Sequence, residues 1–477
     1  MAQNSFAGLV PSGSLGLKLL LVCLLVLVMG VPLLTVGALV GEREARARQV
    51  TAEIGDRAGG AQMVGGPMLL VPYTRPVESA DDQGRVQRRT ERGTYVVFAQ
   101  EGSADATLAV EERNRGIYRA ATYTATTDFS ARFNAAEALE NVDDTYSFDW
   151  SGARIVMFVR DSRAIRETAE LRFSDGATAT LEPLSDISLM TSGQTTTVSR
   201  PGIFSSPQYI EPTNLQAFAA ARPFNAAPAE FSVETRLVLG GAQRFSLAAF
   251  AQNTSASIRG DRTDASFEGY FQSNEQTEMA EGGFVRSWSV PFVARGIEKA
   301  ADLNTFNLGA AADRDMAVSF VAADNVYQGV ARAVRYGIMF IGIVFLATLI
   351  FEAVSGKRAH PAQYILVGLA QCVFYLLLLS ITELAGFSLA FAIAATGTVL
   401  LLAYYAGVSF RSRAVGIRAL VGLGLLYAAM YVLMTLEDFA LFAGSVVAFA
   451  VIAATMIATR RIDWYGRGAV AQPAATE

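Results

Sequence analysis

The chain has 477 residues, of which 52% are hydrophobic and only 17% are charged, and its net charge at pH 7 is −5. Ordinary soluble domains carry roughly 25% charged residues. Of the 83 charged residues in this chain, 67 fall within residues 41–333, so the composition divides the chain into a soluble-looking middle and an apolar remainder. The middle contains 29 Lys and Arg against 38 Asp and Glu residues, which gives no electrostatic reason to expect nucleic-acid binding.

The first apolar run covers residues 15–40 and is interrupted only by Lys18 near its start. A cleaved signal peptide would have an apolar core of about 7–15 residues followed by a small-residue cleavage site. This run is longer, and Val36-Gly37-Ala38 is a poor cleavage site. We therefore predict an uncleaved transmembrane helix, kinked at Pro32 and continued as a helix through residues 41–58.

The middle of the chain is predicted to be a β-rich domain. Its short stretches of β-branched and aromatic residues often alternate, and turn signals such as Ser174-Asp175-Gly176 separate them. This pattern favours a sandwich or a barrel-like sheet. The predicted strands are residues 94–99, 117–126, 155–159, 178–181, 231–239, 245–249, 254–258 and 284–290. Residues 135–139, 214–221 and 311–323 are predicted to be short helices or edge segments.

Five further apolar runs follow, and each is long enough to cross a hydrocarbon core of about 30 Å as a helix. They cover approximately residues 336–354, 363–382, 387–409, 418–436 and 439–459. A helix is required because lipid offers no hydrogen-bonding partner to the backbone. Basic residues mark the loops at 357–360, 411–418 and 460–467, whereas acidic residues mark the loops between, and short basic loops stay in the cytoplasm.

These runs predict an α+β membrane protein with six transmembrane helices, one before and five after a large β-rich, sandwich-like domain. The predicted parts are a cytoplasmic tail (1–14), the first helix (15–40), the periplasmic domain (41–333), the five-helix bundle (334–463) and a second cytoplasmic tail (464–477). Arg43, Arg46, Arg48 and Arg57 oppose this orientation, but large domains are translocated largely regardless of charge.

Catalytic side chains are scarce in the middle domain. It has no histidine and no cysteine, since Cys23 and Cys372 both lie in apolar runs, and Lys299 is its only lysine. Ser-His-Asp and Cys-His arrangements and the usual zinc sites are therefore excluded there, as are disulfides. A Ser-Lys dyad would need Lys299. A carboxylate pair drawn from Asp143, Asp144 and Asp149 could support glycoside hydrolysis.

We predict that the protein is not an enzyme and has no catalytic, cofactor-binding or metal-binding residues. The sequence gives little indication of a transport function, because coupled transporters usually have ionisable groups near mid-membrane. Glu352, Glu383, Glu437 and Asp438 instead lie near the ends of their helices, and Gln371 is expected to bond to a neighbouring helix. A membrane transporter or channel-like protein, and an enzyme acting on cell-wall or lipid-linked glycans, stay open as alternatives.

Three local motifs have structural interpretations. Residues 59–67 are glycine-rich and precede an apolar strand, which favours a turn over a phosphate-binding loop. Residues 112–118 are interpreted as a charged turn before a strand. His360, the only histidine, is followed by Pro361, which suits the first turn of a helix, and we interpret His360 as an interfacial residue.

A further set of segments is similar to a known protein family. The segments are Gln62, 66–67, 71–73, 113–118, Tyr123, 360–370, 374–380, Glu383, 436–441, 444–445 and 459–465. Through them the chain resembles the CreD family of bacterial inner-membrane, cell-envelope integrity proteins. The likeness spans nearly the whole chain, is strongest after Tyr336 and is loose between about Ala131 and Pro291. The family implies expression tied to a two-component envelope-stress regulator and links to colicin tolerance and β-lactam response. It implies no catalytic residues.

We therefore expect a non-enzymatic protein of the bacterial inner membrane that supports envelope integrity and the response to envelope stress. Its domain outside the membrane would be coupled to the helical bundle. The expected partners are membrane lipid and either an envelope protein or a cell-wall component, with no nucleic acid.

The predicted topology can be tested with a reporter enzyme that is active only outside the cytoplasm. Fused near Gly176, it should be active, and fused after Arg461 it should be silent, because the five predicted crossings between these two sites, an odd number, place them on opposite sides of the membrane. The reverse pattern would overturn the predicted orientation.

Overall fold

The computed structural model describes residues 15–80, 86–184, 215–263, 265–278, 282–306, 313–320, 326–355, 359–435 and 440–460. The chain divides into two compact units. We call residues 1–48 with 324–477 the membrane unit, and residues 49–323 the β unit. Apolar helices, one N-terminal and the others C-terminal, flank the β-rich unit in the sequence, so the predicted α+β membrane fold is confirmed.

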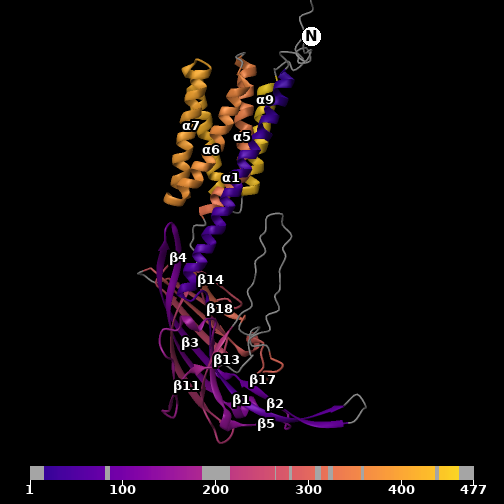
Figure 1. Cartoon of the computed structure of the whole chain (residues 1–477), viewed down its shortest axis with the longest axis vertical. Helices are drawn as coiled ribbons and strands as arrows, with labels where there is room; N and C mark the ends of the chain where they lie inside the picture. Colours follow the sequence, from indigo (N-terminus) through magenta and orange to yellow (C-terminus); the bar gives the residue numbers. More distant parts are fainter. Residues whose placement is uncertain are drawn as a thin grey trace, which may run out of the picture. The chain divides into compact units, whose positions relative to one another are not determined.

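The described strands of the β unit form two sheets (Figure 1). The first has the order β14-β18-β12-β1-β6-β10-β9, and β2 and β5 pair with β1 while β17 pairs with β2. Its strands are β1 (Gln62–Ala80), β2 (Val86–Val97), β5 (Ser147–Phe148), β6 (Arg154–Val159), β9 (Glu182–Pro183), β10 (Gln216–Ala221), β12 (Arg244–Ala248), β14 (Ser266–Gly269), β17 (Ala300–Asp302) and β18 (Asp315–Ser319).

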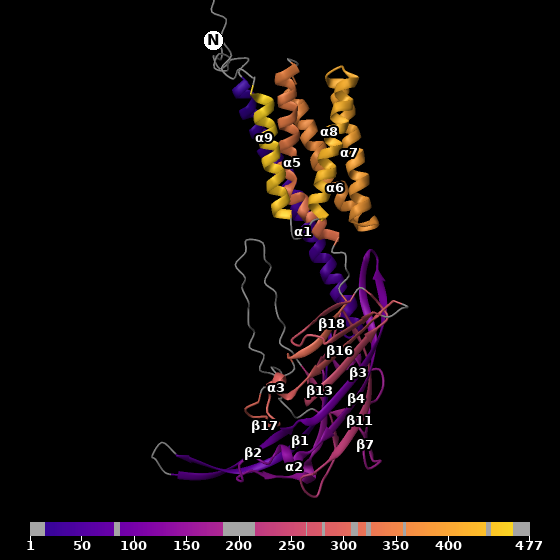
Figure 2. The same cartoon turned by 180° about the vertical axis from the view of Figure 1, so that it is seen from behind.

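The second sheet has the order β15-β16-β13-β3-β4-β11-β7-β8. In Figure 2, β3, β4, β11 and β7 run next to one another. Its strands are β3 (Ala99–Arg115), β4 (Tyr118–Phe133), β7 (Glu170–Phe173), β8 (Thr178–Thr180), β11 (Phe231–Ala242), β13 (Ala251–Gly260), β15 (Glu275–Glu278) and β16 (Phe284–Val290). Most neighbours are antiparallel, but β1 with β12 and β3 with β13 are parallel.

The main hydrophobic core draws on strands of both sheets, as in a sandwich. Side chains of β4 alternate between buried and exposed, because successive residues of a strand point to opposite faces. Strand β1 is buried on both faces. Val71 and Tyr73 join the main core, whereas Met68 and Leu70 join a second cluster that also contains Phe98.

The eight predicted strands all overlap strands of the structure. Residues 135–139 contain a short helix, α2 (Ala135–Ala138), which was one of the two predicted alternatives. The helix alternative is wrong in the described part of 214–221, where β10 covers residues 216–221, and in the described part of 311–323, where β18 covers residues 315–319. The alanine-rich sequence of β10 favours a helix locally, but pairing with β6 over six residues overrides that propensity.

The described helices of the membrane unit are long and run side by side (Figure 1). They are α1 (Leu15–Ala58), α5 (Val326–Ser355), α6 (Pro361–Ala385), α7 (Phe387–Ser409), α8 (Arg413–Thr435) and α9 (Ala440–Thr459). The first five are long and apolar enough to cross a membrane, and α9 contains a shorter apolar segment, Gly444–Ile457. Helix α1 includes Pro32 and continues through Ala58, as predicted.

Turn geometry confirms two of the motif interpretations. Gly59 and Gly60 have φ angles of +112° and +66° and connect α1 to β1, which is a turn and not a phosphate-binding loop. The side chain of Gln62 is buried and donates to the carbonyl oxygen of Gly59. In the charged motif at residues 112–118, residues 112–115 end β3, Gly116 and Ile117 make the turn, and β4 begins at Tyr118.

Gly65 of β1 leaves room for the Phe158 ring of β6, and a larger residue at this position would clash with that ring. A Cβ atom there would lie 2.0 Å from Cε1 of the Phe158 ring. We predict that Gly65→Ala destabilises the β unit by about 1–3 kcal/mol through overpacking. Thermal unfolding of the purified chain would measure the change.

The matched control is Gly116→Asn. Gly116 has a φ angle of +65°, a Cβ atom there would have nothing within 4 Å, and Asn tolerates this conformation. Equal loss of stability in both variants would contradict the overpacking explanation.

Candidate functional site

Helix α1 packs its side chains against α5 and α6 in the membrane unit. A Cβ atom at Gly368 in α6 would lie 2.7 Å from Met29 Sδ. A Cβ atom at Gly337 in α5 would lie 2.8 Å from Leu33 Cδ2. Small residues at such positions let helix backbones approach in a membrane, where dispersion contacts drive helix association.

An ion pair ties α1 to α5 at one end of this contact. The Lys18 ammonium donates to Oε1 of Glu352, and the Tyr364 hydroxyl donates to Oε2 of the same carboxylate at 3.3 Å. Glu352 is 5% exposed, whereas Lys18 is 38% exposed. A buried carboxylate is costly unless it is paired, so Lys18 and Tyr364 together stabilise its charge.

A second ion pair ties α1 to α6 near the opposite end. Nη1 of Arg43 lies 3.7 Å from Oε2 of Glu383, and the Tyr327 hydroxyl donates to Oε1 of Glu383 at 3.3 Å. Helix α1 thus has a cation near each end of its membrane-spanning part, and each cation meets a carboxylate of the C-terminal helices. We call these two groups the α1 ion pairs.

The sequence places Glu352 and Glu383 near helix ends but gives no indication of their partners. Lys18 and Glu352 are 334 positions apart. One feature of the sequence does indicate that such a pair exists. Lys18 is an isolated charge in an apolar run, and an intramembrane charge is expected to have a partner.

His360 caps α6 at its N-terminus. Its Nδ1 accepts from the backbone N–H of Ala362 at 3.2 Å, and Gln363 Oε1 accepts from the His360 N–H at 3.1 Å. Pro361 occupies the first helical turn, as predicted. The sequence interpretation did not anticipate this capping box, which satisfies backbone donors that a helix start leaves free.

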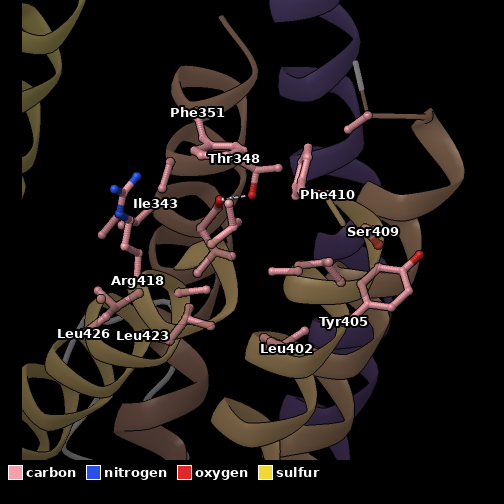
Figure 3. Close-up of a pocket in the computed structure, with 18 of the residues that line it drawn as sticks. Ile343, Thr348, Phe351, Leu402, Tyr405, Ser409, Phe410, Arg418, Leu423 and Leu426 are labelled. Atoms are coloured by element: carbon pink, nitrogen blue, oxygen red, sulfur yellow. Dashed lines mark hydrogen bonds between the residues drawn. The ribbon is translucent and has the colours of Figure 1, made fainter. Parts of the chain in front are cut away.

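A cavity of about 810 Å³ lies between α5, α6, α7 and α8 (Figure 3). Leu402 and Tyr405 of α7 lie across it from Leu423 and Leu426 of α8. Arg418 extends along the α8 side. The apolar lining includes Ile343, Val344, Phe351, Val367, Leu402, Phe410, Val415, Leu423, Leu425 and Leu426.

The predicted interhelical hydrogen bond of Gln371 is not found. Gln371 is 3% exposed, and its Oε1 accepts no hydrogen bond from the residues that the structure describes. Its neighbours on the buried face of α6 include Phe374 and Tyr375, whose rings offer little to an amide oxygen.

Two of the three carboxylates considered for glycoside hydrolysis, Asp143 and Asp149, accept hydrogen bonds within their own turns. Asp143 Oδ1 accepts from the Thr145 N–H at 2.9 Å, and Asp149 Oδ1 accepts from the Ser151 hydroxyl at 2.5 Å. These hydrogen bonds hold the pKa of both carboxyl groups below the ordinary value. A general acid needs a raised pKa, so neither group is suited to that role.

Two further titratable groups of the β unit, Lys299 and Tyr73, are bonded to carboxylates. Lys299 Nζ donates to Glu137 Oε1 at 2.9 Å, which removes it from a Ser-Lys dyad. The Tyr73 hydroxyl donates to Asp302 Oδ2 at 2.5 Å, and burial raises the pKa of Tyr73. No group of three or more potential metal ligands occurs among the residues that the structure describes.

Arg295 is a buried cation with no ion-pair partner in the described parts of the chain. It is 1% exposed, its Nε donates to the Ala249 carbonyl oxygen at 3.0 Å, and its guanidinium lies 3.9 Å from the centre of the Phe98 ring. Burial and the nearby Arg314 lower the pKa of Arg295 to about 9. The contact with Phe98 is a cation–π interaction that joins the second cluster of the β unit to its short helix α3 (Phe292–Arg295).

Comparison with known proteins gives matches over nearly the whole chain. A family model described as "Inner membrane protein CreD" matches residues 14–465. Inner membrane protein CreD of Escherichia coli (strain K12) is 26% identical over 443 residues, which cover 92% of this chain and 91% of the relative. These matches confirm the family resemblance inferred from the sequence.

The ion pair at Glu352 can be tested by a double-mutant cycle. Glu352→Gln should reduce the stability of the membrane unit by about 1–3 kcal/mol, less than for a fully buried pair because Lys18 is partly exposed. Thermal unfolding in detergent should show that the double variant loses less stability than the sum of the losses in Lys18→Gln and Glu352→Gln.

Arg48→Gln is the control, because Arg48 forms an exposed ion pair with Glu44 one turn away and should change stability little. Additive effects of Lys18→Gln and Glu352→Gln would contradict direct coupling of the two residues.

Proposed function

Because the chain belongs to the CreD family of inner membrane proteins, we propose that it is a non-enzymatic protein that supports envelope integrity and the response to envelope stress. The coarser identity, a multi-pass protein of the inner membrane, follows from the family and from the apolar helices. The observation that carries the proposal is that α1 is one unbroken helix whose residues belong to both units.

The orientation forms part of the proposal. The β unit is periplasmic and both termini are cytoplasmic. The support is the alternation of basic and acidic residues between successive C-terminal helices, with Arg411 and Arg413 where α7 is followed by α8 and Glu383 near the end of α6.

The proposed mechanism is mechanical or sensory coupling through α1. A load or a ligand on the β unit would act on residues 49–58 of α1, which belong to that unit. The same helix is held in the membrane unit by the α1 ion pairs at Glu352 and Glu383. A rigid helix transmits a displacement or a rotation along its axis, because each backbone N–H is bonded to a carbonyl four residues earlier.

A non-enzymatic role is supported by the bonding of the candidate groups. Asp143 and Asp149 have lowered pKa values, and Lys299 is paired with Glu137. The partner that we propose for the β unit is an envelope protein or a cell-wall component. Membrane lipid is the partner proposed for the helices.

The coupling role can be tested by softening α1 near the boundary between the units. Replacing residues 48–51 by four glycines should abolish the protein's function in the envelope. The reason is that each glycine costs about 1 kcal/mol of helix stability relative to alanine. Susceptibility to a β-lactam in a strain that depends on this protein would be the readout, with protein amount checked by immunoblot.

The matched control replaces the same four residues by alanine, which removes the same side chains but keeps the helix. The alanine variant should retain function. If the glycine variant accumulates normally and also retains function, coupling through a rigid α1 is excluded.

A further inference from the structure

The cavity of the membrane unit has an apolar body and one charged lining residue. Its volume of about 810 Å³ lies within the range of about 300–1,000 Å³ that is usual for small-molecule sites. Arg418 is the one charged side chain among the described residues that line it. The apolar residues come mainly from α5, α6, α7 and α8, and α9 contributes Ala454.

The polar lining groups are concentrated at one end of the bundle. Ser409 is the last residue of α7, Gln363 lies in the first turn of α6, and Arg418 lies in the second turn of α8. Leu425 and Leu426 line the cavity further along α8, about 10 Å from Arg418 at 1.5 Å per residue. The cavity therefore has a polar end and an apolar depth.

Three of the polar lining residues, Thr348, Gln363 and Tyr364, are already bonded within the protein. The Thr348 hydroxyl donates to the Val344 carbonyl at 2.9 Å, Gln363 Oε1 accepts from His360, and the Tyr364 hydroxyl donates to Glu352. Glu352 in turn is paired with Lys18, so its charge is compensated. Arg418 is exposed and has no ion-pair partner among the residues that the structure describes.

We propose that this cavity binds one anionic phospholipid, with acyl-chain atoms in the apolar depth and the phosphate at Arg418. The charge is complementary, because the unpaired cation stands at the polar end and guanidinium groups bind phosphate oxygens through two parallel N–H donors. Basic pockets between transmembrane helices are known to bind anionic headgroups. Arg411 and Arg413 lie in the adjacent loop and at the start of α8, and add positive charge at the same end.

The chemistry of the walls favours a lipid over a water-soluble anion. A free anion would have to give up its hydration for a lining that is mostly apolar and holds one cation, Arg418, which is costly. A phospholipid delivers its phosphate to the membrane surface and places only its apolar chain against the leucine and phenylalanine side chains (Figure 3).

The test measures lipid bound to the purified full-length chain by native mass spectrometry. Phosphatidylglycerol and phosphatidylethanolamine with identical acyl chains are offered separately. The wild-type chain should hold one phosphatidylglycerol in preference to phosphatidylethanolamine. Arg418→Gln should lower phosphatidylglycerol occupancy about fivefold, as expected for one cation near the headgroups, and should leave phosphatidylethanolamine unchanged. Arg335→Gln makes the same charge change on α5 away from the cavity and should leave both lipids unchanged.

Filling the cavity supplies an independent variant. Gly422 lines the cavity and has nothing within 4 Å of a Cβ position, so Gly422→Phe should fit and should displace both lipids. Gly397→Phe is the control, since Gly397 is equally open but does not line the cavity. Ala406→Phe is a second filling variant, and thermal unfolding would establish that each variant is folded.

Two results would overturn the proposal. One is equal occupancy by both lipids in the wild-type chain together with no effect of Arg418→Gln. The other is undiminished phosphatidylglycerol occupancy in a folded Gly422→Phe or Ala406→Phe variant. If neither filling variant folds, the change in lipid preference on Arg418→Gln decides the matter.

Discussion

The membrane unit depends on the pairing of α1 with helices that follow it by some 300 residues. Hydrocarbon offers no partner to a charge, so Lys18 and Glu352 are each tolerable mainly because of the other. A second pair, Arg43 with Glu383, lies 25 residues further along α1, or about 37 Å at 1.5 Å per residue. That length is close to the thickness of a bilayer, so the two pairs also fix the depth of α1 relative to α5 and α6.

The β unit is inserted between the two parts that this pairing joins. Its own stability comes from a different source, the burial of apolar side chains between two sheets, with β1 buried on both faces. Two buried polar side chains of this unit, Arg295 and Tyr73, are bonded to other residues of the same unit. Arg295 lies on the Phe98 ring, and Tyr73 bonds to Asp302. Such bonding supports the proposal that the β unit receives a partner or a load and does not perform catalysis.

Local sequence patterns were reliable wherever a single element carries its own signal. The long apolar runs predicted the membrane helices, and alternation of β-branched and aromatic residues predicted strands such as β4 and β11. The patterns were misleading for residues 214–221 and 315–319, where short segments become strands because neighbouring strands supply their hydrogen bonds. The sequence does not predict that His360 caps α6, because an N-cap depends on the geometry of the turn that follows it.

The sequence by itself determined the α+β membrane class, the continuation of α1 to Ala58 and the scarcity of catalytic side chains, because hydropathy and composition are properties of the chain alone. Only the tertiary structure decided that Lys18 meets Glu352, that Asp143 and Asp149 are bonded within their own turns, and that Arg418 lines a cavity. The reason is physical: periodicity reports which face of an element avoids water, whereas partners far apart in the chain are chosen by how those faces pack.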